Sequence, residues 1–185
     1  MNRNICVFAA ASCNVDKVYR DAARETGMYI GREGDTLLFG AGNGGLMGVC
    51  ARAVHAHGGK VVGVIPQGLN GPGVAYPDCD ELIVTVGLRE RKAVFDVRSH
   101  AFVALPGGFG TMEELLETIT LKQLGVHRRP IVVMNINGYY DSLLTQFEVG
   151  MRQSFAQEEC RELYHVAADV QSGFDFLNQI FTKED

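Results

Sequence analysis

Three glycines and two glutamates stand close together in the segment LPGGFGTMEE, residues 105–114. The segment separates an apolar run, HAFVAL, from a run with helical periodicity, ELLETITLKQL. Glycine lets the backbone approach a ligand closely and adopt a positive φ, so several N–H groups can point at one anion. The segment therefore predicts either a tight turn or a phosphate-binding loop with a carboxylate beside it.

The start of the predicted helix assigns different roles to the two glutamates. Thr111 stands at the expected N-cap position and Glu114 follows three residues later, which matches the T-x-x-E capping box. Glu114 is therefore expected to have a structural role. Glu113 would lie in the first helical turn, where the helix dipole favours an ionised carboxylate. Such a carboxylate suits charge stabilisation or weak base catalysis, and the alternative is a helix-start residue without a catalytic role.

Two further stretches could bind a phosphate. GAGNGG (40–45) matches G-x-G-x-x-G, but it follows the second strand and lacks the acidic residue about 20 positions on that would hold a ribose. It is either a packing turn or a site for one phosphate or ribose. In RERK (89–92), Arg91 and Lys92 oppose the dipole of the helix they begin, which indicates an anionic partner. The alternative is a solvated cationic face.

The elements that must position these residues follow from the apolar pattern. Continuously apolar runs predict strands at residues 4–9, 36–40, 60–65, 81–86, 101–105, 131–136 and 164–167. Runs with helical periodicity predict helices at residues 15–31, 45–57, 88–99, 111–124, 139–153 and 170–182. Continuous apolar strands are typical of a parallel sheet covered on both faces. The alternation of strand and helix predicts right-handed βαβ units and an α/β fold with a doubly wound parallel sheet.

The unusual stretches all follow predicted strands. AASCN comes after the first strand, GAGNGGLMG after the second and PGGFGT after the fifth. Ligands of open parallel sheets bind outside the carboxyl ends of the strands, so the three stretches are expected to share one crevice. The segment 66–80 is the one long loop, and it either has a function or only connects two strands.

Composition excludes several classes of protein. The 185 residues suit a single domain spanning residues 1–185. A net charge of −5 argues against a nucleic-acid binder, and no apolar run approaches the roughly 20 residues that cross a bilayer. Five cysteines without a CxxC pattern predict reduced thiols in a cytoplasmic protein. HExxH is absent, so we expect no metal site. G-x-S-x-G and a P-loop are absent as well.

The combination of GLMG after a glycine loop, ERKA after ELIVT, and ALPGGFGTMEELLE resembles the LONELY GUY (LOG) family. Members of that family are cytokinin riboside 5′-monophosphate phosphoribohydrolases, often labelled lysine decarboxylases. The combined RK and PGGxGTxxE pattern is highly specific, and the resemblance extends over most of the chain to about residue 150.

The resemblance implies a Rossmann-like fold, a homodimer and a nucleoside 5′-monophosphate substrate. It implies hydrolysis to the free base and ribose 5-phosphate, without a metal or redox cofactor. Arg91 and Glu113 match the catalytic pair, and Arg91 would orient Glu113. The residues implied in substrate binding are Ser12, Gly44, Gly45, Met47, Lys92, Pro106, Gly107, Gly108, Phe109, Gly110, Thr111 and Thr120.

The chain also departs from the family pattern. AASCN replaces a GSS-like turn and leaves Ser12 as its remnant, GAGNGG replaces a triple-glycine turn, and VGLRE replaces a common Met-His before RK. Leu121 lies where a tryptophan is frequent. These changes affect the base pocket more than the phosphate site. Two alternatives therefore stay open, a nucleotide- or cofactor-binding carrier without catalysis and a nucleosidase for ordinary purine 5′-monophosphates.

Dimerisation is also indicated by apolar residues on two predicted helices. Residues 111–124 carry more apolar positions than one sheet face would bury, and residues 88–99 mix Val94, Phe95 and Val97 with charges. Symmetric pairing of these helices would bury the surplus. The alternative is that the chain after residue 150 covers it.

Overall fold

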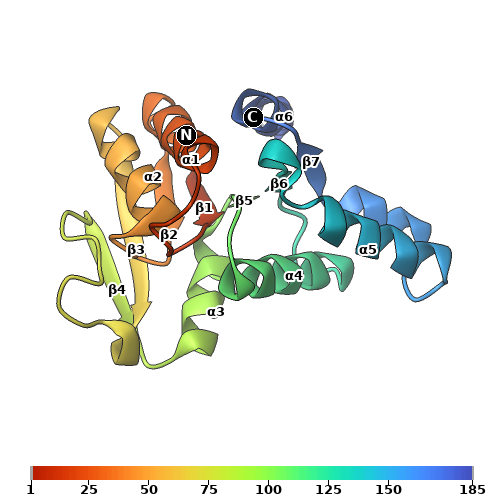
Figure 1. Ribbon diagram of the computed structural model, residues 1–185, viewed down its shortest axis with the longest axis horizontal. Helices are drawn as coiled ribbons and strands as arrows, with labels where there is room; N and C mark the ends of the chain where they lie inside the picture. The colour runs from red at the N-terminus through yellow and green to blue at the C-terminus, as the bar shows by residue number, and fades with distance from the viewer. Residues whose placement is uncertain (1, 185) are drawn as a thin grey trace.

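The computed structural model describes residues 2–184. Seven parallel strands form one sheet in the order β4-β3-β2-β1-β5-β6-β7 (Figure 1). The strands are β1 (Asn4–Phe8), β2 (Thr36–Phe39), β3 (Lys60–Pro66), β4 (Glu81–Thr85), β5 (Ala101–Ala104), β6 (Ile131–Met134) and β7 (His165–Ala167). The predicted doubly wound α/β fold is confirmed, since the chain runs outward from β1 to β4 and then outward again from β5 to β7.

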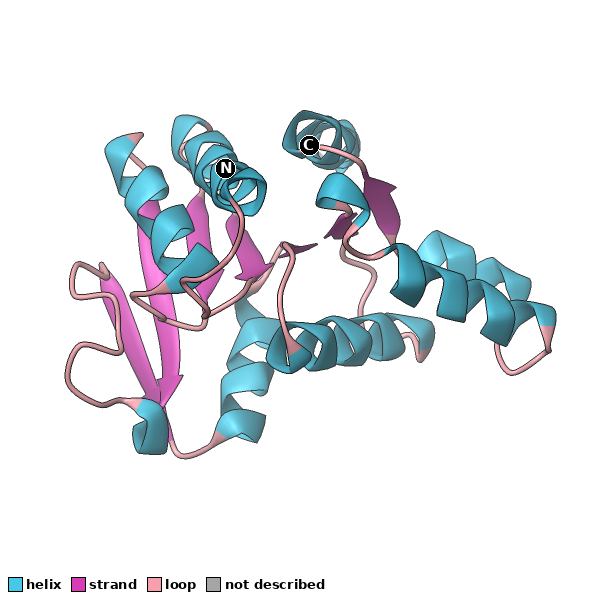
Figure 2. Cartoon of the chain, viewed as in Figure 1, coloured by secondary structure: helices cyan, strands magenta, loops and turns pink. Residues whose placement is uncertain are grey.

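Six α-helices alternate with the strands (Figure 2). They are α1 (Lys17–Arg32), α2 (Gly45–Ala56), α3 (Leu88–Arg98), α4 (Phe109–Gln123), α5 (Asp141–Arg152) and α6 (Val170–Glu184). Short 3₁₀ helices lie at η1 (Gln67–Leu69), η2 (Ile136–Gly138) and η3 (Glu158–Leu163). Every predicted strand and helix is present within two residues of its predicted bounds.

The sheet separates two apolar cores, as its continuously apolar strands require. Helices α1, α2 and α6 cover the upper face in Figure 1 and pack around Ile30, Leu46 and Phe174. Helices α3, α4 and α5 cover the other face and pack around Phe95, Leu115 and partly buried Leu144. Helix α2 therefore lies on one face of the sheet and α4 on the other. Both helices follow the carboxyl ends of strands, α2 after β2 and α4 after β5.

The start of α4 differs from the prediction. Gly108 is the N-cap, with φ −82° and ψ −156°, and the helix begins at Phe109. Thr111 is inside the first turn and 4% exposed, because its side chain fills the space left by the missing side chain of Gly107. The predicted capping box of Thr111 and Glu114 is therefore wrong, and the helix starts without any side-chain cap.

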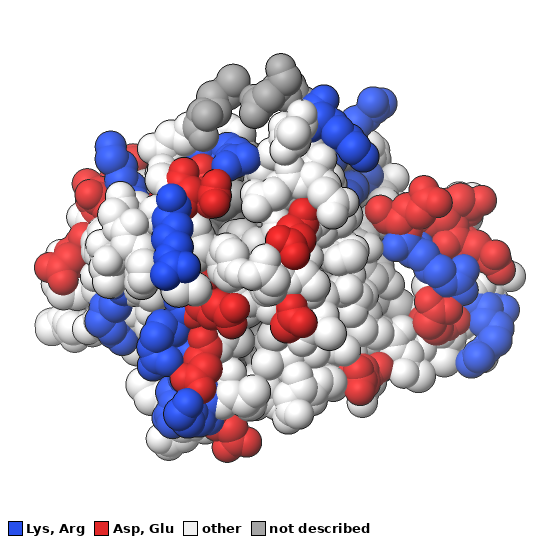
Figure 3. Space-filling view, turned by 90° about the horizontal axis from the view of Figure 1, so that it is seen from above, with Lys and Arg blue, Asp and Glu red and all other residues white. Residues whose placement is uncertain are grey.

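The surface carries charges of both signs. On the face formed by α1, α2 and α6, basic and acidic side chains are interspersed and do not gather into a basic stripe (Figure 3). Within the described chain, no helix is both long and apolar enough to cross a bilayer.

Candidate active site

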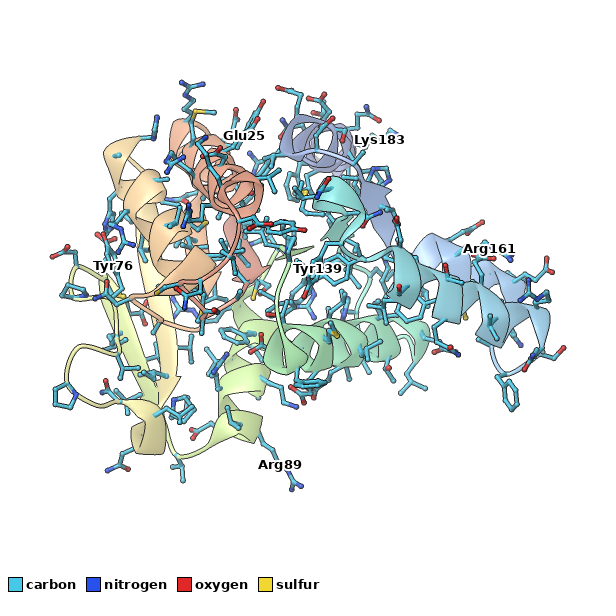
Figure 4. All side chains as sticks on the ribbon, viewed as in Figure 1. Glu25, Tyr76, Arg89, Tyr139, Arg161 and Lys183 are labelled. Atoms are coloured by element: carbon cyan, nitrogen blue, oxygen red, sulfur yellow. The ribbon has the colours of Figure 1, made fainter. Side chains whose placement is uncertain are left out.

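A crevice opens where the strand order reverses between β1 and β5. It has a volume of about 370 Å³ and is lined by Ser12 after β1, by Pro106, Gly107 and Gly108 after β5, and by Tyr139. Tyr139 lies near the centre of the view in Figure 4, and its hydroxyl donates a hydrogen bond of 2.6 Å to the Gly107 carbonyl. Leu46 of the stretch after β2 also lines the crevice, so residues of all three stretches that were predicted to share one crevice do so. Ligands of open α/β sheets bind at such a position.

The loop after β5, which we call the open glycine loop (residues 106–110), leaves space free. A Cβ added to Gly108 or Gly110 would meet no heavy atom within 4 Å. Neither residue has the positive φ that the sequence analysis allowed, so backbone conformation does not explain these glycines. Because α4 has no side-chain cap, no side chain of the protein binds the free N–H groups of its first turn. The arrangement can accept an anion.

The loop after β2, which we call the filled glycine loop (residues 40–45), is occupied by the protein itself. A Cβ on Gly40 would lie 2.8 Å from Arg91 Nη2, and one on Gly42 would lie 2.5 Å from Met47 Cε. Gly45 has φ +57° and packs against the backbone of Ala10. The packing-turn interpretation therefore explains these three glycines.

Arg91 forms an ion pair with Glu114 and not with Glu113. Arg91 Nη2 donates to Glu114 Oε1, and the two side chains are 14% and 12% exposed. The guanidinium lies 5.2 Å above the Phe95 ring, and its Nε is buried without a hydrogen-bond partner. The predicted contact of Arg91 with Glu113 is wrong, because adjacent residues of α4 point about 100° apart and Glu114 is the one that faces Arg91, while Glu113 faces Lys92.

Burial brings the pKa of Glu114 close to neutral pH. Desolvation raises its pKa to about 7, although the charge of Arg91 acts in the opposite direction. The neighbouring Glu113 adds to the rise. A carboxyl that exchanges its proton near neutral pH can act as an acid or as a base.

Glu113 lies on the outer side of the same helix. Its carboxylate pairs with Lys92, which also pairs with Glu117. Glu113 is 57% exposed, whereas Lys92 is 21% exposed. These two ion pairs raise the pKa of Lys92. Lys92 therefore stays charged and connects α3 to α4 beside the Arg91–Glu114 pair.

A second, smaller cavity lies between α3 and α4. Its volume is about 240 Å³, and its aromatic floor consists of Phe8, Phe95 and Phe102. Lys92 and Glu114 are on its walls. The buried ion pair therefore borders a space with an apolar base.

The other predicted site residues lie in different parts of the structure, and not all of them are in the crevice. Ser12 is in the crevice, and Gly44 and Gly45 begin α2 beside the Cys13 thiol, which accepts the Gly45 N–H at 3.3 Å. Phe109 is 93% exposed at the first residue of α4. Thr120 is away from both cavities, on the surface of α4, where its hydroxyl donates to Leu116 O.

Among the side chains that the structure describes, no group of three or more His, Cys, Asp and Glu residues is arranged to hold a metal ion. The five cysteines carry free thiols.

Sequence reasoning missed two residues of the site. Tyr139 has no local signal, since it bonds to a residue 32 positions away. Glu114 does have a local signal in the sequence. Counted from Pro106, the final glutamate of the PGGxGTxxE pattern is Glu114.

Known proteins resemble this chain over most of its length. The family model described as "Possible lysine decarboxylase" matches residues 47–177. The cytokinin riboside 5′-monophosphate phosphoribohydrolase LOG2 of Arabidopsis thaliana is 36% identical over 183 residues, covering 99% of this chain and 86% of the relative. The probable cytokinin riboside 5′-monophosphate phosphoribohydrolase LOGL1 of Oryza sativa subsp. japonica is 42% identical over 159 residues, covering 86% and 71%.

Among solved structures, the Moco carrier protein of Chlamydomonas reinhardtii superposes with a TM-score of 0.74 at 25% identity, covering 99% of both chains. The identity to the phosphoribohydrolases is higher, at 36% over 183 residues and 42% over 159 residues. The chain belongs to the LOG family of phosphoribohydrolases, whose family model is described as possible lysine decarboxylase.

Proposed function

We propose that the protein hydrolyses the N-glycosidic bond of N6-substituted adenosine 5′-monophosphates and releases the free base and ribose 5-phosphate. The observation that carries this proposal is the buried Arg91–Glu114 pair on the helix that begins at the open glycine loop. Glu114 follows the N-cap by six residues, about 9 Å along the helix axis. Side chains of a helix lean toward its N-terminus, so a ribose 5-phosphate can reach from the loop to the pair.

The phosphate would bind the first amides of α4. Gly108 and Gly110 leave the approach open, and Ser12 faces it from the β1 loop. The remaining residues proposed to line the substrate site are Gly44, Gly45, Met47, Pro106, Gly107, Phe109 and Thr111. Thr120 would contribute only from a second copy, because its surface position is away from both cavities.

The buried pair would act on the sugar. Cleavage of a glycosidic bond places positive charge on the ribosyl ring, and an ionised Glu114 stabilises that charge and accepts a proton from the attacking water. The water oxygen bonds to C1′ while the C1′–N bond breaks and the base leaves with the bonding electrons. Glu114 then passes the proton it took from the water to the base, so the base is released neutral and Glu114 is ionised again. The unpartnered Nε of Arg91 can donate to a sugar hydroxyl.

Replacing each glutamate separately tests this assignment. Glu114→Gln keeps the shape and removes the charge, and we expect kcat to fall by about 10²–10³-fold. Glu113→Gln is the matched control, because its carboxylate is exposed, and we expect kcat to change by less than about threefold. A large loss in Glu113→Gln with normal turnover in Glu114→Gln would restore the assignment made from the sequence.

A carrier without catalysis is the second candidate, supported by the structural similarity to the Moco carrier protein. A carrier needs an open anion site but not the buried ion pair. Incubation of the protein with AMP and N6-prenyl AMP, followed by chromatography of the bases, separates the two functions. Binding without base release would establish the carrier function. Equal release from both nucleotides would indicate a general purine 5′-monophosphate nucleosidase.

We further propose that residues 1–185 are one nucleotide-monophosphate-binding domain of a cytoplasmic homodimer. The apolar residues Val97, Leu116 and Leu124 remain 82%, 40% and 72% exposed on α3 and α4, although η3 packs against α4. A symmetric partner would bury them. Light scattering at low micromolar concentration tests this, and a fully active 20.2 kDa monomer would contradict it.

A further inference from the structure

The filled glycine loop contains a strained residue that is not a glycine. Ala41 has φ +60° and is fully buried, although this left-handed conformation is unfavourable for a residue with a Cβ. Its neighbours Gly40 and Gly42 do not have positive φ. They instead make room for Arg91 and Met47, so the turn at Ala41 determines where these two side chains lie. Strain of this kind persists only where the surroundings hold it in place.

The loop between β3 and β4 holds this turn. We call residues 70–80 the strap. Its Tyr76 N–H donates to Ala41 O at 2.8 Å, and Asn43 N–H donates to Val74 O at 2.9 Å. Gly42 and Ala75 form an isolated antiparallel bridge between these bonds. The strap therefore adds a short antiparallel ladder to the filled glycine loop.

His55 in turn holds the strap. Its Nδ1 lies 2.9 Å from the Tyr76 hydroxyl and its Nε2 lies 3.0 Å from Asp80 Oδ2. Asp80 Oδ2 also accepts the Val61 N–H at 2.7 Å, and the Asp80 N–H donates to Val61 O at 2.9 Å. Tyr76 is 5% exposed where the strap passes beside α2, at the left edge of Figure 4. One imidazole thus connects α2, the strap and the start of β3.

The Asp80 carboxylate accepts a hydrogen bond from His55 Nε2. The hydrogen bond from His55 is the largest of the causes that lower the pKa of Asp80. In the tautomer with the proton on Nε2, Nε2–H donates to Asp80 and Nδ1 accepts the Tyr76 O–H. The other charged or titratable groups that act on Tyr76 are Asp78 and Cys79 of the strap and Arg52 of α2.

We propose that His55 is a positioning residue that acts through Tyr76 and the strap to hold the strained turn at Ala41, and thereby keeps Arg91 aligned with Glu114. An unbroken series of direct contacts connects His55 to Arg91. His55 bonds to Tyr76, the Tyr76 amide bonds to Ala41, and the next residue back, Gly40, packs against Arg91. The consequence for catalysis rests on the proposed function of Arg91, whereas the clamp itself does not.

Four variants test the clamp. His55→Ala removes both contacts, whereas His55→Gln offers a carbonyl and an amide at similar positions. His57→Ala is the matched control, because His57 also ends α2 but bonds only to Ala53 O of its own helix. Ala41→Gly in the His55→Ala background provides a residue that adopts φ +60° without strain.

Hydrogen exchange measures the clamp without any substrate. We expect the amides of Asn43 and Tyr76 to exchange about tenfold faster in His55→Ala than in the wild type, because their bonds form the ladder that the clamp holds. We expect wild-type exchange in His57→Ala. Unchanged exchange of both amides in His55→Ala would overturn the clamp.

Turnover of AMP or N6-prenyl AMP measures the consequence. We expect kcat to fall about tenfold in His55→Ala and affinity for inorganic phosphate to stay within about twofold, because Arg91 moves while the open glycine loop does not. His55→Gln and the Ala41→Gly double variant should each recover part of kcat. A loss of melting temperature with normal kcat, or an equal kcat loss in His57→Ala, would overturn the positioning role. If wild-type protein releases no base, the proposed function fails while hydrogen exchange still decides the clamp.

Discussion

The two glycine loops have similar sequences and opposite surroundings. In the filled loop, the space above Gly40 and Gly42 is taken by Arg91 and Met47. In the open loop, the space above Gly108 and Gly110 contains no atom of the chain within 4 Å. The comparison shows that a missing Cβ can admit either a side chain of the protein or a ligand, and only the neighbours distinguish the two. The ion pair between Arg91 and Glu114 connects the two loops. Arg91 packs against the filled loop, and Glu114 belongs to the helix that begins at the open loop.

Gly45→Ala should have the largest effect, and it acts on the filled loop. The new Cβ would lie 2.5 Å from the Ala10 carbonyl oxygen at a residue with φ +57°. We expect the free energy of unfolding to fall by about 3 kcal/mol, from overlap and backbone strain together. Denaturant unfolding measures this loss, and wild-type stability would show that the loop can rearrange freely.

Gly108→Ala should separate binding from stability in the open loop. Its Cβ meets nothing in the chain, so we expect the free energy of unfolding to change by less than about 1 kcal/mol. The methyl group would obstruct the approach of a phosphate to the helix amides, and we expect KM to rise about 30-fold. Steady-state kinetics on AMP, with unfolding of the same sample as the control, gives both numbers. An unchanged KM would mean that the phosphate binds elsewhere.

The pH dependence of activity and of stability should report the protonation of Glu114, which connects the two loops through its ion pair with Arg91. With a pKa of about 7, the ionised fraction of Glu114 falls about tenfold between pH 8 and pH 6, and kcat/KM should fall with it. Between pH 4.5, the ordinary pKa of a glutamate, and about pH 7, Glu114 keeps its proton in the folded protein but has lost it in the unfolded chain. Stability should therefore decrease as pH rises through this window. Glu114→Gln should remove that decrease, and a flat wild-type profile would contradict the raised pKa.

Tyr139→Phe should have the smallest effect. It removes only the hydroxyl that donates to Gly107 O at 2.6 Å. We expect kcat/KM to fall about fivefold, since one hydrogen bond to a half-buried loop contributes about 1 kcal/mol. Phosphate protection of the loop against proteolysis provides an independent measurement. A change larger than that of Gly108→Ala would show that the tyrosine contacts the substrate itself.

The fold could be predicted from the sequence because the signals that specify it are local. Apolar runs such as Ile131–Met134 are continuous, and each is followed by a helix of clear periodicity. The ion pairs of the site could not be assigned in the same way. Glu113 and Glu114 are adjacent and point about 100° apart on α4, so only one of them can face Arg91. The misplaced helix start gave Glu114 a capping role and left Glu113 as the functional carboxylate. Thr111 caused the error, because it resembles a cap in the sequence but fills the space beside Gly107 in the structure.

Contacts between distant residues left no pattern at all. His55 meets residues 21 and 25 positions away, and nothing in the loop 66–80 marks Tyr76 as its partner. The strain at Ala41 is equally invisible, because a sequence of glycines around it suggests that a glycine carries the positive φ. Such features depend on where the loop returns, which only the assembled sheet determines.

Tyr139 and Tyr140 also determine the order in which the site can form. The Tyr140 hydroxyl donates to Leu105 O at 2.7 Å, next to the bond from Tyr139 to Gly107, and these bonds join residues 35 and 32 positions apart. During synthesis, the glycines of the open loop and Glu114 leave the ribosome before either tyrosine. A nascent chain that ends before Tyr139 therefore contains the whole set of proposed catalytic residues but lacks two bonds that fix the entrance of the loop. The site matures only after β6 has joined the sheet, so an incomplete chain should not capture nucleotide.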